Sequence, residues 1–269
     1  MKLKDKVVVV TGGTSGIGQA CALAFGSAGA TVVVSGRDRV KLAETSRELD
    51  GAGIRHLALQ ADVSVEEDVA RMVEETVSSY GRIDILLNNA GISMRALFED
   101  LKLDVIRQVM YINFYGTVYA TKYALPYLIQ TKGSVVGVSS IAGYRGLPGR
   151  TGYTASKAAM QGFLEALRTE MIPHGVHVLV ACPGYTTSNI RKTSLVADGR
   201  QQGETPLEEG KLMSSEEVAE KILQATLHRK RDLIMTTQGK LTVFLNKWIP
   251  GVMDKVVIRY IQREGQIKS

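Results

Sequence analysis

Cysteine, histidine and long apolar runs are all scarce in this sequence of 269 residues. Cys21 and Cys182 are the only cysteines, and their apolar surroundings argue against a disulfide or a metal site and favour a reducing cytoplasm. The four histidines show no spacing that is typical of metal ligands. No apolar run reaches the ~18 residues that a membrane-spanning helix needs, so none is expected.

The N-terminus and the charge distribution exclude further classes. Residues 1–6 lead directly into the apolar run Val7–Val10, without the longer apolar core and the cleavage site of a signal peptide. The net charge of +6 belongs to the C-terminal part, because residues 228–269 hold nine Lys or Arg and three acidic residues while the rest is neutral in sum. These bases alternate with aliphatic residues and accompany no recognition motif, so nucleic-acid binding is not expected.

Short apolar segments alternate with amphipathic ones over the first two thirds of the chain. Strands are predicted at 7–11, 31–35, 55–60, 84–87, 134–138 and 176–181, and helices at 17–28, 39–50, 65–79, 103–129 and 153–172. Apolar runs without strict alternation are typical of parallel strands that are buried on both faces. The pattern predicts a single α/β domain, a Rossmann-like doubly wound parallel sheet.

The segment 186–213 interrupts this alternation. It is polar and longer than an ordinary connection, so it is predicted to be a substrate lid. A capping box at Ser214–Glu217 then predicts a helix that ends near Leu227, and an edge strand is expected at 233–236. The chain is therefore divided into a domain of residues 1–236 and a basic amphipathic helical extension of residues 237–269.

A glycine-rich segment joins the first predicted strand to the first helix. Glycines at this place allow a tight turn and a close approach of backbone to a pyrophosphate, while the helix N-terminus supplies free N–H groups. The spacing Gly-x-x-x-Gly-x-Gly differs from the Gly-x-Gly-x-x-Gly of the usual dinucleotide fingerprint, and a tight turn without a ligand is the alternative. The residues expected to bind a nucleotide here are Gly12, Thr14, Ser15, Gly16, Ile17 and Gly18.

The end of the second predicted strand favours NADP(H) over NAD(H). Gly36 stands where an NAD site places a carboxylate, and the guanidinium of Arg37 matches a 2′-phosphate. The alternative is a surface role for Arg37, with Asp38 on the ribose. Two further strand ends, Asp62-Val63 and Asn88–Gly91, are polar or small. There Asp62 can accept from the adenine amino group, and Asn89, Ala90 and Gly91 can line the nucleotide, although such residues also favour turns in any protein.

Tyr153 and Lys157 are four residues apart, about one helical turn, and so share one helix face. Free tyrosine titrates near ~10, and a nearby positive charge lowers that pKa. Ser140 precedes them at the end of a predicted strand, and Asn113 is a polar residue that is expected to bend an apolar helix. Taken singly, Tyr153 could be a core tyrosine, Ser140 a strand-end serine and Asn113 a helix-kink residue. Their joint occurrence after a glycine-rich segment is improbable by chance.

With these residues assembled, the chain resembles the classical short-chain dehydrogenase/reductase family from residue 5 to about 190. The resemblance implies that Tyr153 is the acid/base, that Lys157 lowers its pKa and binds the nicotinamide ribose, and that Ser140 orients the substrate oxygen. It implies that Asn113 holds a proton-relay water. It also implies cofactor contacts at Pro183, Gly184 and Ser188, and substrate contacts at Ser93, Met94, Ile141, Leu147 and Tyr185.

The leading hypothesis is an NADP-dependent carbonyl reductase or alcohol dehydrogenase for an apolar substrate, assembled as a homodimer or homotetramer. The alternative is a non-catalytic nucleotide-binding sensor or scaffold on the same fold. Segment 195–200, the helix after Ser214 and the break at 248–251 resemble the branch with membrane-associated lipid reductases, such as acyl-dihydroxyacetone phosphate reductase. For the extension, three roles stay open: contact with an anionic membrane, cover of the cleft, or packing on another subunit.

Overall fold

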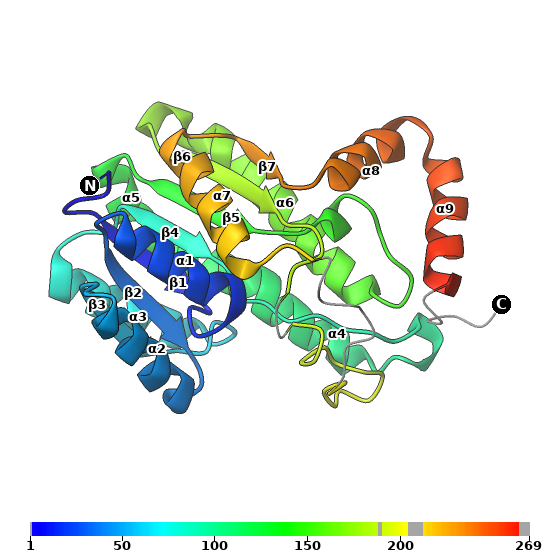
Figure 1. Cartoon of the computed structure of the whole chain (residues 1–269), viewed down its shortest axis with the longest axis horizontal. Helices are drawn as coiled ribbons and strands as arrows, with labels where there is room; N and C mark the ends of the chain where they lie inside the picture. The colour runs from blue at the N-terminus through cyan, green and yellow to red at the C-terminus, as the bar shows by residue number, and fades with distance from the viewer. Residues whose placement is uncertain (1, 188–189, 204–211, 264–269) are drawn as a thin grey trace.

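The computed structural model describes residues 2–187, 190–203 and 212–263. Its seven strands form one sheet in the order β3-β2-β1-β4-β5-β6-β7, in which all neighbours pair in parallel (Figure 1). The strands are β1 (Val7–Thr11), β2 (Thr31–Gly36), β3 (His56–Gln60), β4 (Ile85–Asn88), β5 (Ser134–Val138), β6 (His177–Cys182) and β7 (Asp232–Ile234). The predicted Rossmann-like α/β fold is confirmed.

Helices cover both faces of this sheet (Figure 1). The α-helices are α1 (Gly16–Ser27), α2 (Arg39–Gly51), α3 (Glu66–Tyr80), α4 (Leu103–Met110), α5 (Gly116–Thr131), α6 (Thr151–Met171), α7 (Ser215–Leu227), α8 (Thr237–Trp248) and α9 (Pro250–Arg263). The short helical turns are η1 (Phe98–Asp100), η2 (Tyr111–Tyr115), η3 (Ile141–Gly143) and η4 (Ile172–His174).

The alternation of side chains along β1 explains why its apolar run is continuous. Val8 and Val10 join the core that contains α1 and α7, while Val7 and Val9 join the core that contains α3, α5 and α6. Both faces are therefore buried, and burial of each such side chain stabilises the fold by roughly 1.5–3 kcal/mol. Between β1 and β4 the chain changes its direction of winding, and the loops at the carboxyl ends of these strands form the crevice where this fold binds ligands.

The helix predicted over 103–129 is interrupted. It consists of α4, the π-helical turn η2 and α5, and Asn113 is fully buried within η2. A π turn places an extra residue in the helix and redirects the side chains that follow. The bend expected at Asn113 is thus present, but the sequence does not give its form.

The segment after the predicted lid forms α7, β7 and the start of α8, close to the predicted boundaries. The capping box is confirmed, since Ser214 Oγ accepts from Glu217 N at 3.1 Å and Glu217 Oε2 accepts from Ser214 N at 3.1 Å. The edge strand expected at 233–236 is β7, which ends at Ile234, and Thr236 caps α8 by accepting from the Gly239 amide at 2.9 Å. Across the described residues, no helix is long and apolar enough to cross a bilayer.

Candidate active site

Two adjoining cavities occupy the crevice at the carboxyl ends of the central strands. The larger has a volume of about 430 Å³ and the smaller about 230 Å³. Ile17, Asn89, Gly91 and Ile190 line both cavities, so the two belong to one elongated site.

The glycine-rich turn forms one end of the smaller cavity and needs its glycines for steric reasons. Gly12 has φ +62°, and a Cβ there would lie 2.8 Å from the Ala90 Cα. A Cβ on Gly18 would lie 2.2 Å from the Gly12 carbonyl oxygen. The Asn89 amide holds this turn by donating to the carbonyls of Thr11 at 3.1 Å and Gly12 at 3.0 Å. Asn89 therefore positions the turn as well as lining the cavities.

The first turn of α1 presents amide groups at this cavity. Its N-cap residue, Ser15, makes no side-chain hydrogen bond to the turn, and Ser15, Gly16 and Ile17 line the smaller cavity. Uncapped N–H groups at a helix N-terminus attract an anion, because the helix dipole adds to the hydrogen bonds. These residues therefore fit a nucleotide phosphate.

Two cations line the smaller cavity close to Gly36, which itself lies against Thr14 of the glycine-rich turn. One is the predicted Arg37; the other is Lys41, which the sequence reasoning missed although it follows one turn later on α2. Asp38 is engaged elsewhere, because it caps α2 by accepting from the amides of Val40 at 2.9 Å and Lys41 at 3.2 Å. Arg37 and Lys41 thus face the cavity, while one carboxylate oxygen of Asp38 caps α2.

Asp62 and Val63 line the same cavity, but they follow β3 rather than closing it, since β3 ends at Gln60. The carboxylate of Asp62 accepts from the Ser64 amide at 2.9 Å and from the Ser64 hydroxyl at 2.6 Å. Its other oxygen lies 3.4 Å from Arg37 Nη1. Asp62 thus fixes the turn after β3 and also links it to Arg37.

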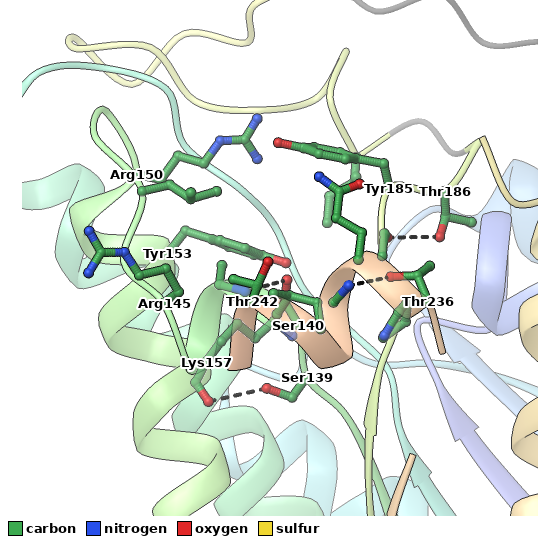
Figure 2. Close-up of a pocket in the computed structure, with 18 of the residues that line it drawn as sticks. Ser139, Ser140, Arg145, Arg150, Tyr153, Lys157, Tyr185, Thr186, Thr236 and Thr242 are labelled. Carbon is green, nitrogen blue, oxygen red and sulfur yellow. Dashed lines mark hydrogen bonds between the residues drawn. The ribbon is translucent and has the colours of Figure 1, made fainter. Parts of the chain in front are cut away.

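Ser140, Tyr153 and Lys157 come together on the larger cavity, as Figure 2 shows. Ser140 follows β5 and caps η3, where its Oγ accepts from the Ala142 amide at 3.1 Å. Tyr153 and Lys157 lie on α6, and both are buried. Lys157 Nζ donates to the Val138 carbonyl at 2.9 Å. The three side chains come from two elements that pack against each other at the end of β5.

Burial controls the protonation of this group. It raises the pKa of Tyr153 above its ordinary value, and the hydrogen bond with Ser140 and the charge of Arg150 oppose the rise only in part. Burial also lowers the pKa of Lys157 to about 8. The sequence predicts a lowered pKa for Tyr153, whereas the structure gives a raised one. The reason is that desolvation outweighs the hydrogen bond with Ser140 and the charge of Arg150.

Asn113 acts as a clamp between three segments. Its Oδ1 accepts from the Ile92 amide at 2.8 Å, and its Nδ2 donates to the Ile92 carbonyl at 2.9 Å and to Ser156 Oγ at 2.9 Å. Both amide hydrogens are therefore used within the protein. The residue ties the loop after β4 to α6, next to Lys157, and so fixes the site's geometry.

The predicted substrate residues divide into two groups. Ile141, Leu147 and Tyr185 line the larger cavity, as do Pro183 and Gly184 of the predicted cofactor residues. Figure 2 shows Tyr185 at this cavity. Ser93 and Met94 are instead buried behind the wall, 2% and 0% exposed, where Met94 pairs with Leu195 in an isolated bridge. Neither residue lines the two cavities, and contact of Ser93 and Met94 with a substrate stays a prediction. Ser188 lies outside the described residues.

The C-terminal extension closes one side of the larger cavity. Its lining residues from α8 and α9 are Gln238, Gly239, Thr242, Met253, Val256 and Val257. Arg145 fixes this placement, because its guanidinium donates to Asn246 Oδ1 at 3.0 Å and to Asp254 Oδ1 at 2.5 Å. Among the three roles left open for the extension, cover of the cleft is the one present in the structure.

In the described part of the chain, no three His, Cys, Asp or Glu side chains lie close enough together to bind a metal ion. Cys21 and Cys182 are both free and buried, as expected from their surroundings. Burial raises the pKa of the Cys182 thiol to about 12, so this neighbour of the site is an inert thiol.

Comparisons with known proteins point to one family. The sequence profile of the short chain dehydrogenase family matches residues 6–198. The chain is 37% identical to mouse dehydrogenase/reductase SDR family member 7B over 99% of this chain and 84% of that protein. The protein of the same name from Xenopus laevis is 38% identical over 99% of this chain and 85% of its own length. An 11-beta-hydroxysteroid dehydrogenase-like 4A from Arabidopsis thaliana is 40% identical over 73% of this chain and 66% of its own.

Proposed function

Because this chain belongs to the short-chain dehydrogenase/reductase family, whose members are oxidoreductases of alcohols and carbonyls, we propose that it is an NADPH-dependent reductase of an apolar carbonyl compound. The observation that carries the proposal is that Ser140, Tyr153 and Lys157 all line the larger cavity, which adjoins the smaller cavity at the glycine-rich turn. A non-catalytic nucleotide sensor would have little use for this alignment.

The chain's own residues supply the proton and the orientation. A bound nicotinamide nucleotide would supply the hydride. The Tyr153 hydroxyl donates its proton to the carbonyl oxygen as hydride reaches the carbonyl carbon, which yields the alcohol, and the phenolate then recovers a proton from solvent. Ser140 Oγ donates a hydrogen bond to the same oxygen. Lys157 stabilises the phenolate by its charge and binds the nicotinamide ribose, and Asn113 keeps α6 and the loop after β4 in register.

The preference for NADPH rests on charge. Arg37 and Lys41 line the end of the smaller cavity, while Asp38 is engaged in capping α2. A 2′-phosphate carries the charge that two cations attract, and a guanidinium pairs with phosphate in two parallel hydrogen bonds. Asp62 would accept from the adenine amino group, on the far side of its contact with Ser64.

The apolar nature of the substrate rests on the wall of the larger cavity. Ile141, Leu147, Ile190, Met253 and Val257 all contribute to this wall. A cavity of about 430 Å³ is in the range that accommodates a drug-sized molecule. The proposed substrate therefore has one carbonyl near Tyr153 and an apolar body that extends toward α8 and α9.

Assembly and location are part of the same proposal. Tyr111 and Tyr115 are 48% and 40% exposed at the junction of α4 and α5, which would suit an interface with a second copy in a homodimer or homotetramer. The scarcity of cysteine supports a cytoplasmic location.

The test is NADPH oxidation with ketones and aldehydes of increasing apolar length, with NADH assayed in parallel. We expect kcat/KM to rise with apolar length until the larger cavity is filled, and to be higher with NADPH. Tight NADPH binding without turnover of any carbonyl, and without oxidation of the matching alcohols, would instead support the sensor.

A further inference from the structure

The two helices of the extension, α8 and α9, carry residues that line the larger cavity and also apolar residues that are exposed to solvent. The cavity is lined by Thr242 of α8 and by Met253 and Val257 of α9, which are 5% and 8% exposed. Large apolar side chains of the same helices are also exposed to solvent, and we call this set the outer patch. The outer patch consists of Leu241 (55% exposed), Phe244 (60%), Trp248 (67%), Ile249 (42%), Val252 (53%) and Val256 (49%).

The outer patch is continuous along α8. Leu241, Phe244 and Trp248 follow one another at intervals of three and four residues, so they lie on one helix face. The rings of Phe244 and Trp248 are 6.4 Å apart between centroids. Single exposed apolar residues are normal on a protein surface, but a contiguous group of aromatic and aliphatic side chains marks a site of interaction with a protein or a membrane.

The charge around the outer patch is positive. Between residues 237 and 263 the chain has five Lys or Arg and a single acidic residue, Asp254. That carboxylate is 70% exposed and pairs with Arg145 at 2.5 Å. The cations Lys240, Lys247, Lys255 and Arg259 are all exposed. The surface presented outward by α8 and α9 is therefore both apolar and cationic.

We propose that the outer patch docks on an anionic lipid bilayer and places the mouth of the larger cavity against it. Apolar side chains bordered by lysines are the arrangement with which a helix lies in a membrane interface, where tryptophan is also favoured. A second copy of the chain is a poorer occupant, since a twofold axis through the patch brings like charges together.

Val256 belongs to both sets of residues. It lines the larger cavity and is 49% exposed, so it stands at the boundary between the cavity and the outer patch. In the docked protein an apolar carbonyl compound passes from the bilayer to Tyr153 beside this residue without crossing water. This second step rests on the proposed function, whereas the docking itself does not.

The fluorescence of the full chain tests docking directly. Trp248 is the only tryptophan, so its emission reports the outer patch alone. With vesicles of phosphatidylcholine and phosphatidylserine we expect a blue shift, quenching by brominated lipid, and co-sedimentation that declines with salt. Vesicles of phosphatidylcholine alone should bind at least tenfold less protein. Unchanged emission with both vesicles would overturn the proposal.

Variants separate docking from catalysis and from self-association. Co-sedimentation should decline about tenfold in Phe244→Ser and in the double charge reversal Lys240→Glu/Lys247→Glu, while turnover of a water-soluble carbonyl is unchanged. Matched controls are Ile172→Ser, which is 70% exposed on η4, and Lys221→Glu, which is exposed on α7. Equal loss in the controls would overturn the proposal. So would a change of oligomeric state in Phe244→Ser with vesicle binding intact, because the patch would then be a subunit interface.

Discussion

The ammonium of Lys157 lies 5.9 Å from the centroid of the Tyr153 ring. Both side chains are buried on α6, and burial moves their pKa values in opposite directions, upward for Tyr153 and down to about 8 for Lys157. The phenol is therefore protonated at neutral pH, while the ammonium loses its proton only slightly above it. A protonated phenol is the form that can donate a proton to a carbonyl oxygen, so this pair suits the general-acid role proposed for Tyr153.

The first prediction concerns the acid. Tyr153→Phe removes one hydroxyl from a side chain that is 8% exposed, and the ring still fills its place. We expect kcat to fall by roughly 10²–10⁴, the usual contribution of a general acid, while the Kd for NADPH changes less than about threefold. Steady-state kinetics and a binding titration measure the two quantities. Retained turnover, or equal loss of turnover and binding, would reject the role of Tyr153.

The second prediction concerns Arg150, whose charge lowers the pKa of Tyr153 and which lines the larger cavity. In alcohol oxidation the rate rises with pH as the phenol becomes a base. Removal of the charge raises the pKa, so in Arg150→Met this rise should move to higher pH. Arg150→Lys keeps the charge and should keep the wild-type profile. Identical profiles for all three proteins would show that Arg150 does not act on Tyr153.

The third prediction concerns the choice of nucleotide. Arg37→Ala and Lys41→Ala should each raise the KM for NADPH by roughly tenfold, the usual effect of losing a charge-assisted hydrogen bond, with little change for NADH. Arg39→Ala is the matched control, because the Arg39 guanidinium donates to Gln60 Oε1 at 2.7 Å, away from the cavity. Parallel changes for both nucleotides in the Arg37 and Lys41 variants would reject a 2′-phosphate site.

The fourth prediction concerns stability. Asp84 is 4% exposed and accepts from Arg82 at 2.7 and 2.8 Å, from the Val7 amide at 3.0 Å and from Lys6 at 3.0 Å. Burial alone would raise the pKa of this carboxyl, but the hydrogen bonds outweigh it and lower the pKa. Asp84→Asn should therefore reduce the free energy of unfolding at pH 7 by about 2–3 kcal/mol.

The sign of the pH dependence follows from linkage. A carboxylate whose folded pKa lies below its unfolded value near ~3.9 stabilises the fold above that pH, and the stabilisation is lost as the pH falls through the folded pKa. Urea unfolding should show wild type and Asp84→Asn converging as the pH falls below about 4. Asp104→Asn, at an 86% exposed carboxylate, should match wild type at every pH. A constant difference for Asp84→Asn would exclude its ionisation as the cause.

Local patterns in the sequence predict the sheet and the helix caps well, because burial on both faces and capping depend on neighbouring residues. The hydrogen bonds of Asn113 are different, since they join it to Ile92 and Ser156, which are 21 and 43 positions away in the sequence. The placement of the extension likewise depends on Arg145 and Asp254, 109 positions apart. Periodicity identifies an apolar face on α9, but not what that face covers.

The three hydrogen bonds of the Asn113 side chain have a consequence for local unfolding of the protein. The loop after β4, the π turn η2 and α6 share these three hydrogen bonds, so none of these segments can unfold alone without leaving a buried amide unpaired. Segments joined in this way exchange their amide hydrogens as one cooperative unit. We therefore expect the amide of Ile92 and those around Ser156 to exchange slowly and at similar rates, so that this part of the site unfolds as one unit with the π turn.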